Sequence, residues 1–486
     1  MNLVNRVAIT LGLITLSPFA VLGETPSQSL NAILQDSKIP YETSAQAVRL
    51  RDGAILWEKN PGRLLAPASV QKLVLSAAVL AALGPAERIR TPVFITGPIK
   101  DGILQGDLWI VGSGDPMLVS EIMTQEIGNL KHLGLKGING NIYLDQTLFD
   151  REERNEARIG SEGVTTHAYD ALVSALGINF NTISIAVAPS QVGGPARVNL
   201  DPFPLENVKI INQVRTVSGE GQKVSVERRS VGVLEHITVS GTIGIQAPLA
   251  KIYRSFGDGE RTIASYIRGF FLQGGLSITG SVKTGRLPAS AKLFHEIEGY
   301  EMRRIVAGLN NFSNNYLADV LLKKLSTTTD KGRPGSFPLG VQSLNSFLRE
   351  KLGIEPSGYK LHDGSGLHPE NRISANTLTQ VLVHMEKRWD VFPDYLASLP
   401  ASGWDGTLKK RFKGPGMEDI QGVIRAKTGT LTEPVTVSSL AGYFRSEKHG
   451  VVAFSILQNG QRKAQQPSLA QLRESQERLI TELMRL

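Results

Sequence analysis

The sequence lacks cysteine entirely over its 486 residues. Disulfide scaffolds, cysteine nucleophiles, thiolate zinc sites and iron–sulfur clusters are therefore excluded. The eight histidines contain no H-E-x-x-H pair, which argues against a metallopeptidase. A G-x-S-x-G elbow, a Walker A motif and a G-x-G-x-x-G loop are also missing, which disfavours α/β-hydrolase and nucleotide-dependent chemistry. We expect neither a metal nor a cofactor.

The sequence also lacks a strong excess of charge of either sign. Lys and Arg number 53 against 45 Asp and Glu, a net charge of +8 with a pI near 9.4. The surplus fits either a solvated basic surface or contact with an anionic neighbour, such as wall polymer or the lipid head groups of a membrane periphery. No dense run of Lys and Arg marks a nucleic-acid footprint, so no nucleic-acid partner is expected.

Hydrophobic residues make up 41% and charged residues 20% of the chain, which are ordinary globular values. At about 100–200 residues per domain, the length predicts two to four domains. The 49 glycines favour many turns and a sizeable β component. The sequence gives no indication of the oligomeric state.

Only the N-terminus carries a long apolar run, residues 7–22 after Arg6. This run is short of the roughly 20 residues of a membrane-spanning helix. Residues 1–23 therefore predict a secretory signal cleaved around Gly23, and hence export; an uncleaved membrane anchor is the alternative.

Strand signals concentrate at the two ends of the mature chain. Residues 45–57 predict a hairpin around Asp52-Gly53, and three further strands are expected at 422–427, 435–444 and 450–457. Helices are expected at 27–39, 73–83, 313–325, 340–352, 374–388 and 468–484. Residues 91–298 have the texture of short β-strands. This order predicts an α+β fold in which the hairpin and the last three strands form one antiparallel sheet, with the β-rich middle inserted.

The pattern S-x-x-K occurs at Ser69–Lys72 and at Ser357–Lys360. The spacing has chemical meaning on a helix, where side chains three residues apart share a face and an amine reaches a hydroxyl. Ser69 precedes a long apolar helix and is expected in its first turn, whereas Ser357 leads into Gly358 and a turn. An N-cap serine with a solvated lysine is the alternative interpretation of Ser69.

Two further patterns also repeat. K-T-G occurs at 283–285, in the β-rich middle, and at 427–429, where it ends a strand and leaves a cation at its edge. S-x-N begins at Ser29, Ser313, Ser343 and Ser374, and only Ser313 directly precedes an apolar helix after the insertion. The order Ser69, Ser313–Asn315, Lys427–Gly429 is far more specific than any single member.

Several stretches together resemble the D-alanyl-D-alanine carboxypeptidase/endopeptidases, low-mass penicillin-binding proteins with a large insertion between the first two motifs. The likeness covers nearly the whole mature chain and is carried by these stretches: 65–72 LAPASVQK, 112–116 GSGDP, 310–315 NNFSNN, 363–367 DGSGL, 403–408 GWDGTL and 426–431 AKTGTL. It implies peptidoglycan stem peptides and β-lactam antibiotics as ligands and the periplasm as location.

The resemblance also implies a domain organisation. A serine acyltransferase domain of the penicillin-binding/β-lactamase-like type would carry two inserted β-rich domains. On this chain the acyltransferase domain would comprise 24–90 and 299–486. The first insert would comprise 91–174 and 268–298, and the second 175–267.

The resemblance assigns roles to the matching residues. Ser69 would attack the carbonyl of the penultimate D-Ala, Lys72 would take the proton, and Ser313 would relay one to the leaving amine beside Lys427. The remaining roles concern the substrate: Asn315 would bind its amide, the N–H groups of Ser69 and Thr430 would form the oxyanion hole, and Lys427, Thr428 and Thr430, with Gly429 between, would hold the terminal carboxylate. Which base acts first stays open.

Asp145 matches the family more loosely. It would face the side-chain amine of diaminopimelate, or it is a turn aspartate before Thr147. Two other functions are alternatives for the whole chain: a β-lactamase, for which no deacylating glutamate stands out, and a non-catalytic wall-binding scaffold.

Overall fold

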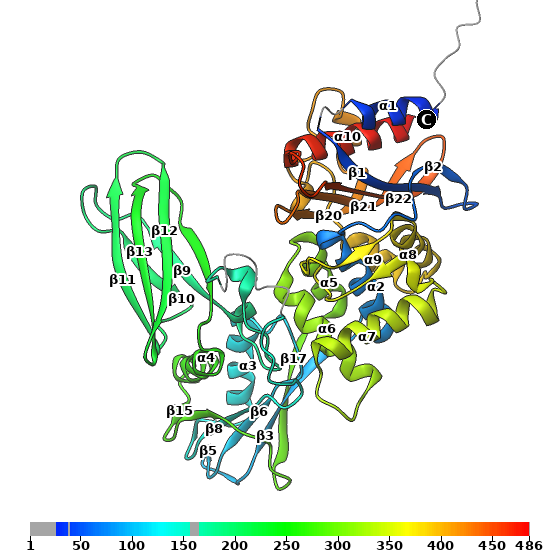
Figure 1. Ribbon diagram of the computed structural model, residues 1–486. Helices are drawn as coiled ribbons and strands as arrows, with labels where there is room; N and C mark the ends of the chain where they lie inside the picture. Colours follow the sequence, from blue (N-terminus) through cyan, green and yellow to red (C-terminus); the bar gives the residue numbers. More distant parts are fainter. Residues whose placement is uncertain (1–25, 37–38, 156–164, 486) are drawn as a thin grey trace, which may run out of the picture.

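The computed structural model describes residues 26–36, 39–155 and 165–485. The predicted signal segment, residues 1–23, lies outside these ranges. Figure 1 shows two parts of the molecule. One contains a sheet formed by strands from the two ends of the chain, and the other is formed by the middle of the chain. No helix in the described ranges combines the length and apolar character that crossing a bilayer requires.

The chain ends meet in a five-stranded antiparallel sheet with the order β2-β1-β22-β21-β20. Its strands are β1 (Tyr41–Arg49), β2 (Ile55–Lys59), β20 (Ile424–Leu431), β21 (Val437–Ser446) and β22 (Gly450–Gly460). The prediction of a single sheet from the hairpin and the last three strands is confirmed. β20 continues four residues beyond its expected end at Lys427, because the ladder to β21 runs on to Leu431.

Helices cover both faces of this sheet (Figure 1). α1 (Pro26–Gln35) lies beside α10 (Leu469–Arg485), which packs on β21, while α8 (Ala375–Lys387) packs on β1 and β22 from the other side. Further helices of this part are α5 (Met302–Asn311), α6 (Asn315–Thr329), α7 (Phe337–Ser346) with its π-helical extension Phe347–Lys351, and α9 (Phe392–Ala397). α1 ends at Gln35, before the expected end at Ile39.

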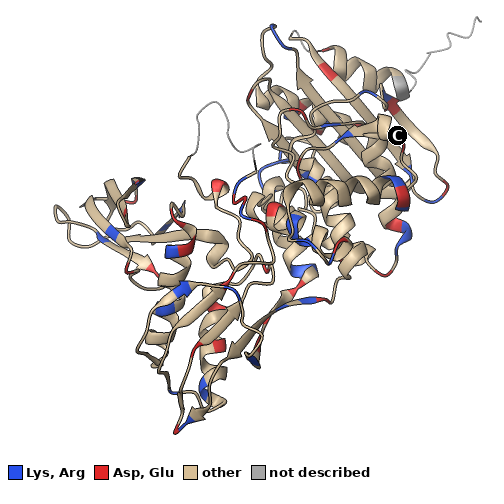
Figure 2. Cartoon of the chain, turned by 60° about the horizontal axis from the view of Figure 1, so that its bottom comes forward, with Lys and Arg blue, Asp and Glu red and all other residues tan. Residues whose placement is uncertain are grey.

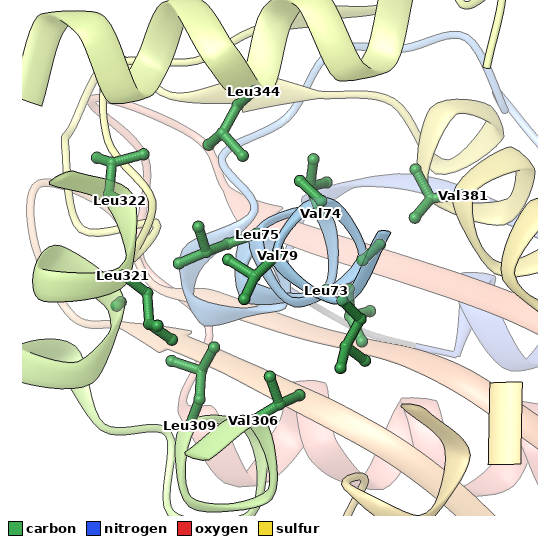
Figure 3. Packing of buried hydrophobic residues seen from close by; sticks show 14 of the residues in the cluster. Leu73, Val74, Leu75, Val79, Val306, Leu309, Leu321, Leu322, Leu344 and Val381 are labelled. Atoms are coloured by element: carbon green, nitrogen blue, oxygen red, sulfur yellow. The ribbon is translucent and has the colours of Figure 1, made fainter. Parts of the chain in front are cut away.

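The central helix of this part is α2 (Lys72–Leu83), which follows the 3-10 turn Ala68–Gln71. Its first nine residues are all buried, as expected for a helix that is apolar on every side. Figure 3 shows how its Leu73, Val74, Leu75 and Val79 pack against side chains of α5, α6 and the helices beyond. This packing fixes the start of α2, where Lys72 lies.

The middle of the chain forms separate sheets. One has the order β16-β8-β6-β3-β17, one β15-β7-β5-β4, one β10-β9-β14 and one β11-β13-β12. The strands are β3 (Arg88–Ile95), β4 (Ile99–Lys100), β5 (Ile103–Leu104), β6 (Leu108–Val111), β7 (Gly137–Ile138), β8 (Ile142–Asp145), β9 (Thr182–Ala188), β10 (Arg197–Asp201), β11 (Val208–Val217), β12 (Gln222–Val231), β13 (Leu234–Gly244), β14 (Ala250–Ser255), β15 (Ser277–Ile278), β16 (Val282–Thr284) and β17 (Lys292–Glu301). A short pair, β18 (Tyr359–Lys360) and β19 (Arg372–Ile373), belongs to the helical part.

The description of residues 91–298 as short β-runs is incomplete, because the described part of this range also contains α-helices. They are α3 (Ser120–His132) and α4 (Gly259–Gln273). Both bury one apolar face in the core of the inserted sheets. In the view of Figure 2, residues of both charge signs are interspersed along the chain. The division of the middle into two inserted domains stays a prediction.

Candidate active site

Ser69 and Lys72 lie at the entrance of α2. The sequence predicted Ser69 in the first turn of the α-helix. In the structure it belongs to the preceding 3-10 turn, because the backbone tightens before Lys72. Ala68 before it has φ +49°, in the sparsely populated left-handed region. The fully buried Nζ of Lys72 donates to Ser69 Oγ at 3.0 Å. The predicted pairing of hydroxyl and amine is therefore present.

The S-x-N stretch forms the connection between α5 and α6. Ser313 has φ +57°, outside the helix that was expected to include it. Asn314 caps α6 by accepting from Leu317 N at 3.1 Å. Asn315 opens α6, and its Oδ1 accepts from Lys72 Nζ at 2.9 Å. The strained turn thus presents the Asn315 amide to Lys72, with the Ser313 hydroxyl two residues before it.

Lys427 joins these two segments to β20. Its side chain is fully buried, and its Nζ donates to Ser313 Oγ at 2.8 Å and to Thr428 O at 2.7 Å. Burial first, and then repulsion from Lys72, lowers the pKa of Lys427 well below its usual value. A lowered pKa makes its ammonium a better proton donor toward Ser313.

The outer edge of β20 changes character along its length. Ala426 N donates to Pro400 O at 3.0 Å, so the first half of the edge is closed by the segment 400–402. Backbone groups alternate between the two edges of a strand with a period of two residues. The N–H groups of Thr428 and Thr430 therefore point to the same outer side, past the closed part. Such an edge accepts an extended peptide as an added strand.

Gly429 allows β20 to approach the serine. A Cβ at this position would lie 2.6 Å from Pro67 O and 3.0 Å from Ser69 N. No side chain fits between this strand and the turn without moving backbone. The close approach brings the N–H groups of Ser69 and Thr430 into one neighbourhood, as an oxyanion hole requires.

The D-G-S-G-L stretch, for which the sequence predicts no role, also contacts Lys72. The structure shows that Ser365 O accepts from Lys72 Nζ at 2.7 Å. The loop is held by the buried carboxylate of Asp363, which accepts six hydrogen bonds between 2.8 and 3.1 Å from Gln71 Nε2, Ser365 Oγ, Gly366 N, Leu367 N, His368 N and Asn371 Nδ2. In the sequence, the only sign of this role of Asp363 is the Gly-rich turn that follows it.

The other copies of the motifs lie elsewhere. Ser357 belongs to a separate 3-10 turn, and the exposed Lys360 pairs with Glu370. Ser29 donates to Glu482 of α10. Ser343 is buried and donates to Leu339 O within α7. Ser374 is the N-cap of α8. Lys283 is exposed on β16. Only the ordered set Ser69, Ser313–Asn315 and Lys427–Gly429 is brought together.

Asp145 is 3% exposed at the end of β8. Its Oδ1 accepts from Thr147 N at 2.8 Å and from Thr147 Oγ1 at 2.7 Å, and its Oδ2 accepts from Leu287 N at 2.7 Å. These contacts match the alternative of a turn aspartate. Binding of a substrate amine by Asp145 stays a prediction.

Comparison with known proteins gives a consistent picture. A model of the D-Ala-D-Ala carboxypeptidase 3 (S13) family matches residues 26–479. The D-alanyl-D-alanine carboxypeptidase of Actinomadura sp. (strain R39) is 29% identical over 94% of this chain and 87% of its own. The D-alanyl-D-alanine carboxypeptidase DacB of Haemophilus influenzae is 26% identical over 85% of this chain and 84% of its own.

Solved structures share the fold. The crystal structure of penicillin binding protein 4 from Haemophilus influenzae superposes with a TM-score of 0.74 at 23% identity, covering 94% of this chain and 99% of that one. A second structure of that protein, complexed with a β-lactam, has a TM-score of 0.70 at 23% identity, with the same coverage of both chains. The expected α+β architecture is thereby confirmed.

Proposed function

Because the chain belongs to the D-Ala-D-Ala carboxypeptidase 3 (S13) family, we propose that Ser69 is the nucleophile with which it hydrolyses peptidoglycan stem peptides. The observation that carries the assignment is the chain of contacts between three distant segments. Lys72 Nζ is hydrogen-bonded to both Ser69 Oγ and Asn315 Oδ1, and Lys427 Nζ to Ser313 Oγ. A hydroxyl, two amines and a second hydroxyl in one buried network suit acyl transfer.

Acylation would begin at the serine. This step uses the unprotonated form of Lys72, which takes the proton of Ser69 Oγ as this oxygen bonds to the carbonyl carbon of the penultimate D-Ala. The resulting oxyanion accepts from the N–H groups of Ser69 and Thr430, and losing one such donor typically costs about 3–4 kcal/mol of transition-state stabilisation. The C–N bond then breaks, and Ser313 passes its proton to the leaving amine while Lys427 Nζ returns one to Ser313 Oγ.

The ester is next hydrolysed by water, which restores Ser69 and releases the shortened peptide. Lys427, Thr428 and Thr430 hold the terminal carboxylate during acylation, and Asn315 binds the substrate amide. The same steps cleave a free D-Ala-D-Ala end or a D-Ala–diaminopimelate cross-link, since only the leaving amine differs. A β-lactam forms the same kind of ester with Ser69 when its ring opens. Export to the periplasm would bring the protein to its peptidoglycan substrate.

The test is covalent labelling with a fluorescent penicillin, combined with D-Ala release from a pentapeptide. We expect Ser69→Ala to abolish both signals, because the ester then has no oxygen to form on. Ser357→Ala, the serine of the other S-x-x-K copy, is the matched control and should keep both. Persistent labelling of Ser69→Ala, or an adduct mapped to another residue, would reject the assignment. Fast release of hydrolysed penicillin would identify a β-lactamase instead.

A further inference from the structure

A short cationic run follows the loop beside the site. Residues 409–413 read Lys-Lys-Arg-Phe-Lys, with four cations in five positions. The sequence interpretation that no dense run of Lys and Arg exists is wrong at this one place. The run begins directly after the 3-10 turn Gly406–Leu408 of the G-W-D-G-T-L stretch.

Two buried side chains fix the conformation of this run. Arg411 is 8% exposed, forms an ion pair with Glu477 of α10 and donates to Arg473 O at 3.2 Å. Phe412, with φ +58°, is fully buried in the core that contains α10. These anchors leave Lys409, Lys410 and Lys413 exposed. Within the described part of the chain, none of the three ammonium groups has a carboxylate at salt-bridge distance.

The run is tied to the candidate site through one hydroxyl pair. Thr428 Oγ1 donates to Thr407 Oγ1 at 2.8 Å, two residues before Lys409. Thr428 lies where the outer edge of β20 passes from its closed to its open part. In the proposed function, this end holds the terminal carboxylate, which belongs to the group that leaves. Anything larger than a single D-Ala on the leaving side must therefore extend toward the loop 403–413.

We propose that Lys409, Lys410 and Lys413 form a subsite for the carboxylates of the leaving stem peptide of a cross-link. The inference rests on the proposed function and names the part of the substrate that it adds. A leaving D-Ala has only the carboxylate held by Lys427 and the threonines. A leaving stem peptide carries further free carboxylates, and exposed cations attract them with a strength that salt screens. The subsite thus favours cleavage of cross-links over release of single D-Ala.

The test compares two soluble substrates, a cross-linked muropeptide dimer and a monomeric pentapeptide. The variant K409E/K410E/K413E should lose about tenfold in kcat/KM on the dimer at low salt, the size expected for a few exposed charge pairs. Its kcat/KM on the pentapeptide should stay within about twofold. Raising the ionic strength should shrink the difference between variant and wild type on the dimer.

A variant with the same change of net charge provides the matched control. Lys209, Lys223 and Lys292 are exposed on β11, β12 and β17, which belong to the inserted sheets and not to the sheet that contains β20. Their triple replacement by Glu should leave both substrates unaffected. An equal loss on dimer and pentapeptide would overturn the subsite, and so would a loss seen only with intact sacculi, which would point to the wall polymer.

Failure of the subsite can be told apart from failure of the proposed function. A wild-type protein that releases D-Ala but never cleaves the dimer overturns the subsite alone. A wild-type protein that neither binds penicillin nor releases D-Ala overturns both. An unchanged rate of penicillin labelling in K409E/K410E/K413E shows that the variant is folded with its serine intact.

Discussion

The two K-T-G copies of this chain end in opposite environments. Lys427 is fully buried within β20, with its Nζ 2.8 Å from Ser313 Oγ. Lys283 is exposed on β16, an edge strand of an inserted sheet, with its Nζ 5.7 Å from the centre of the Tyr143 ring. The same three letters therefore give a buried amine among hydroxyls in one place and a solvated cation in the other.

The difference teaches that burial and partners, rather than the tripeptide, create the chemistry. At Lys427 burial and the neighbouring Lys72 lower the pKa, so the amine exchanges protons readily with Ser313. The third residue differs as much as the first. Gly429 faces the backbone of the Ser69 turn, whereas Gly285 faces the rings of Tyr143 and Trp109.

The largest contrast is expected at the two lysines. Lys427→Ala should lower kcat/KM for D-Ala release by about 10³-fold or more, because it removes the partner of Ser313 and the amine proposed to hold the carboxylate. Lys283→Ala should leave kcat/KM unchanged and cost at most about 1 kcal/mol of stability through the lost contact with Tyr143. Steady-state kinetics and thermal unfolding of both variants measure these effects. Comparable losses of activity would break the comparison.

A smaller contrast is expected at the two glycines. Gly429→Ala should lower the rate of penicillin acylation by about 10²-fold, because its Cβ would press on Pro67 O and Ser69 N and shift the serine. Gly285→Ala meets side-chain atoms instead, at 2.8 Å from Tyr143 and 3.2 Å from Trp109. It should cost stability and keep the acylation rate. If Gly429→Ala acylates normally, the strand does not constrain the serine.

The chain-end sheet was predictable because its strands carry plain signals. The hairpin has Asp52-Gly53 at its turn, and β22 contains the nearly continuous apolar run 451–457. The helices α3 and α4 were missed although signals exist: α4 has Asp258 as N-cap and buries Ile263, Ile267 and Phe271 on one face. Their periodicity lies among many short strands, where a β texture was the simpler interpretation.

The site divides in the same way. The order of the motifs selected the copies of S-x-x-K, S-x-N and K-T-G that the structure brings together, because Ser313 lies shortly after the insertion and directly before an apolar helix. The backbone at Ser313, with φ +57°, could not be predicted, since a non-glycine residue rarely adopts it. Nor could the contact from Lys72 to Ser365 O, a backbone carbonyl 293 positions further along the chain. Such contacts depend on tertiary packing and leave no residue-type signature.

The smallest expected effect concerns the pH dependence of stability. The folded-state pKa of Lys427 lies well below its usual value, which is about 10.4 in the unfolded chain. Between these two values the unfolded chain binds more protons, so the free energy of unfolding rises with pH, by up to about 1.4 kcal/mol per pH unit from this one group. The stability is complete above the unfolded-state pKa and is lost as the pH falls toward the folded-state pKa. Lys427→Met should reduce this slope, measured by urea unfolding at several pH values between 7 and 10. Identical slopes for wild type and Lys427→Met would mean that the buried amine keeps its charge on folding, and the contrast with Lys283 would then rest on hydrogen bonding alone.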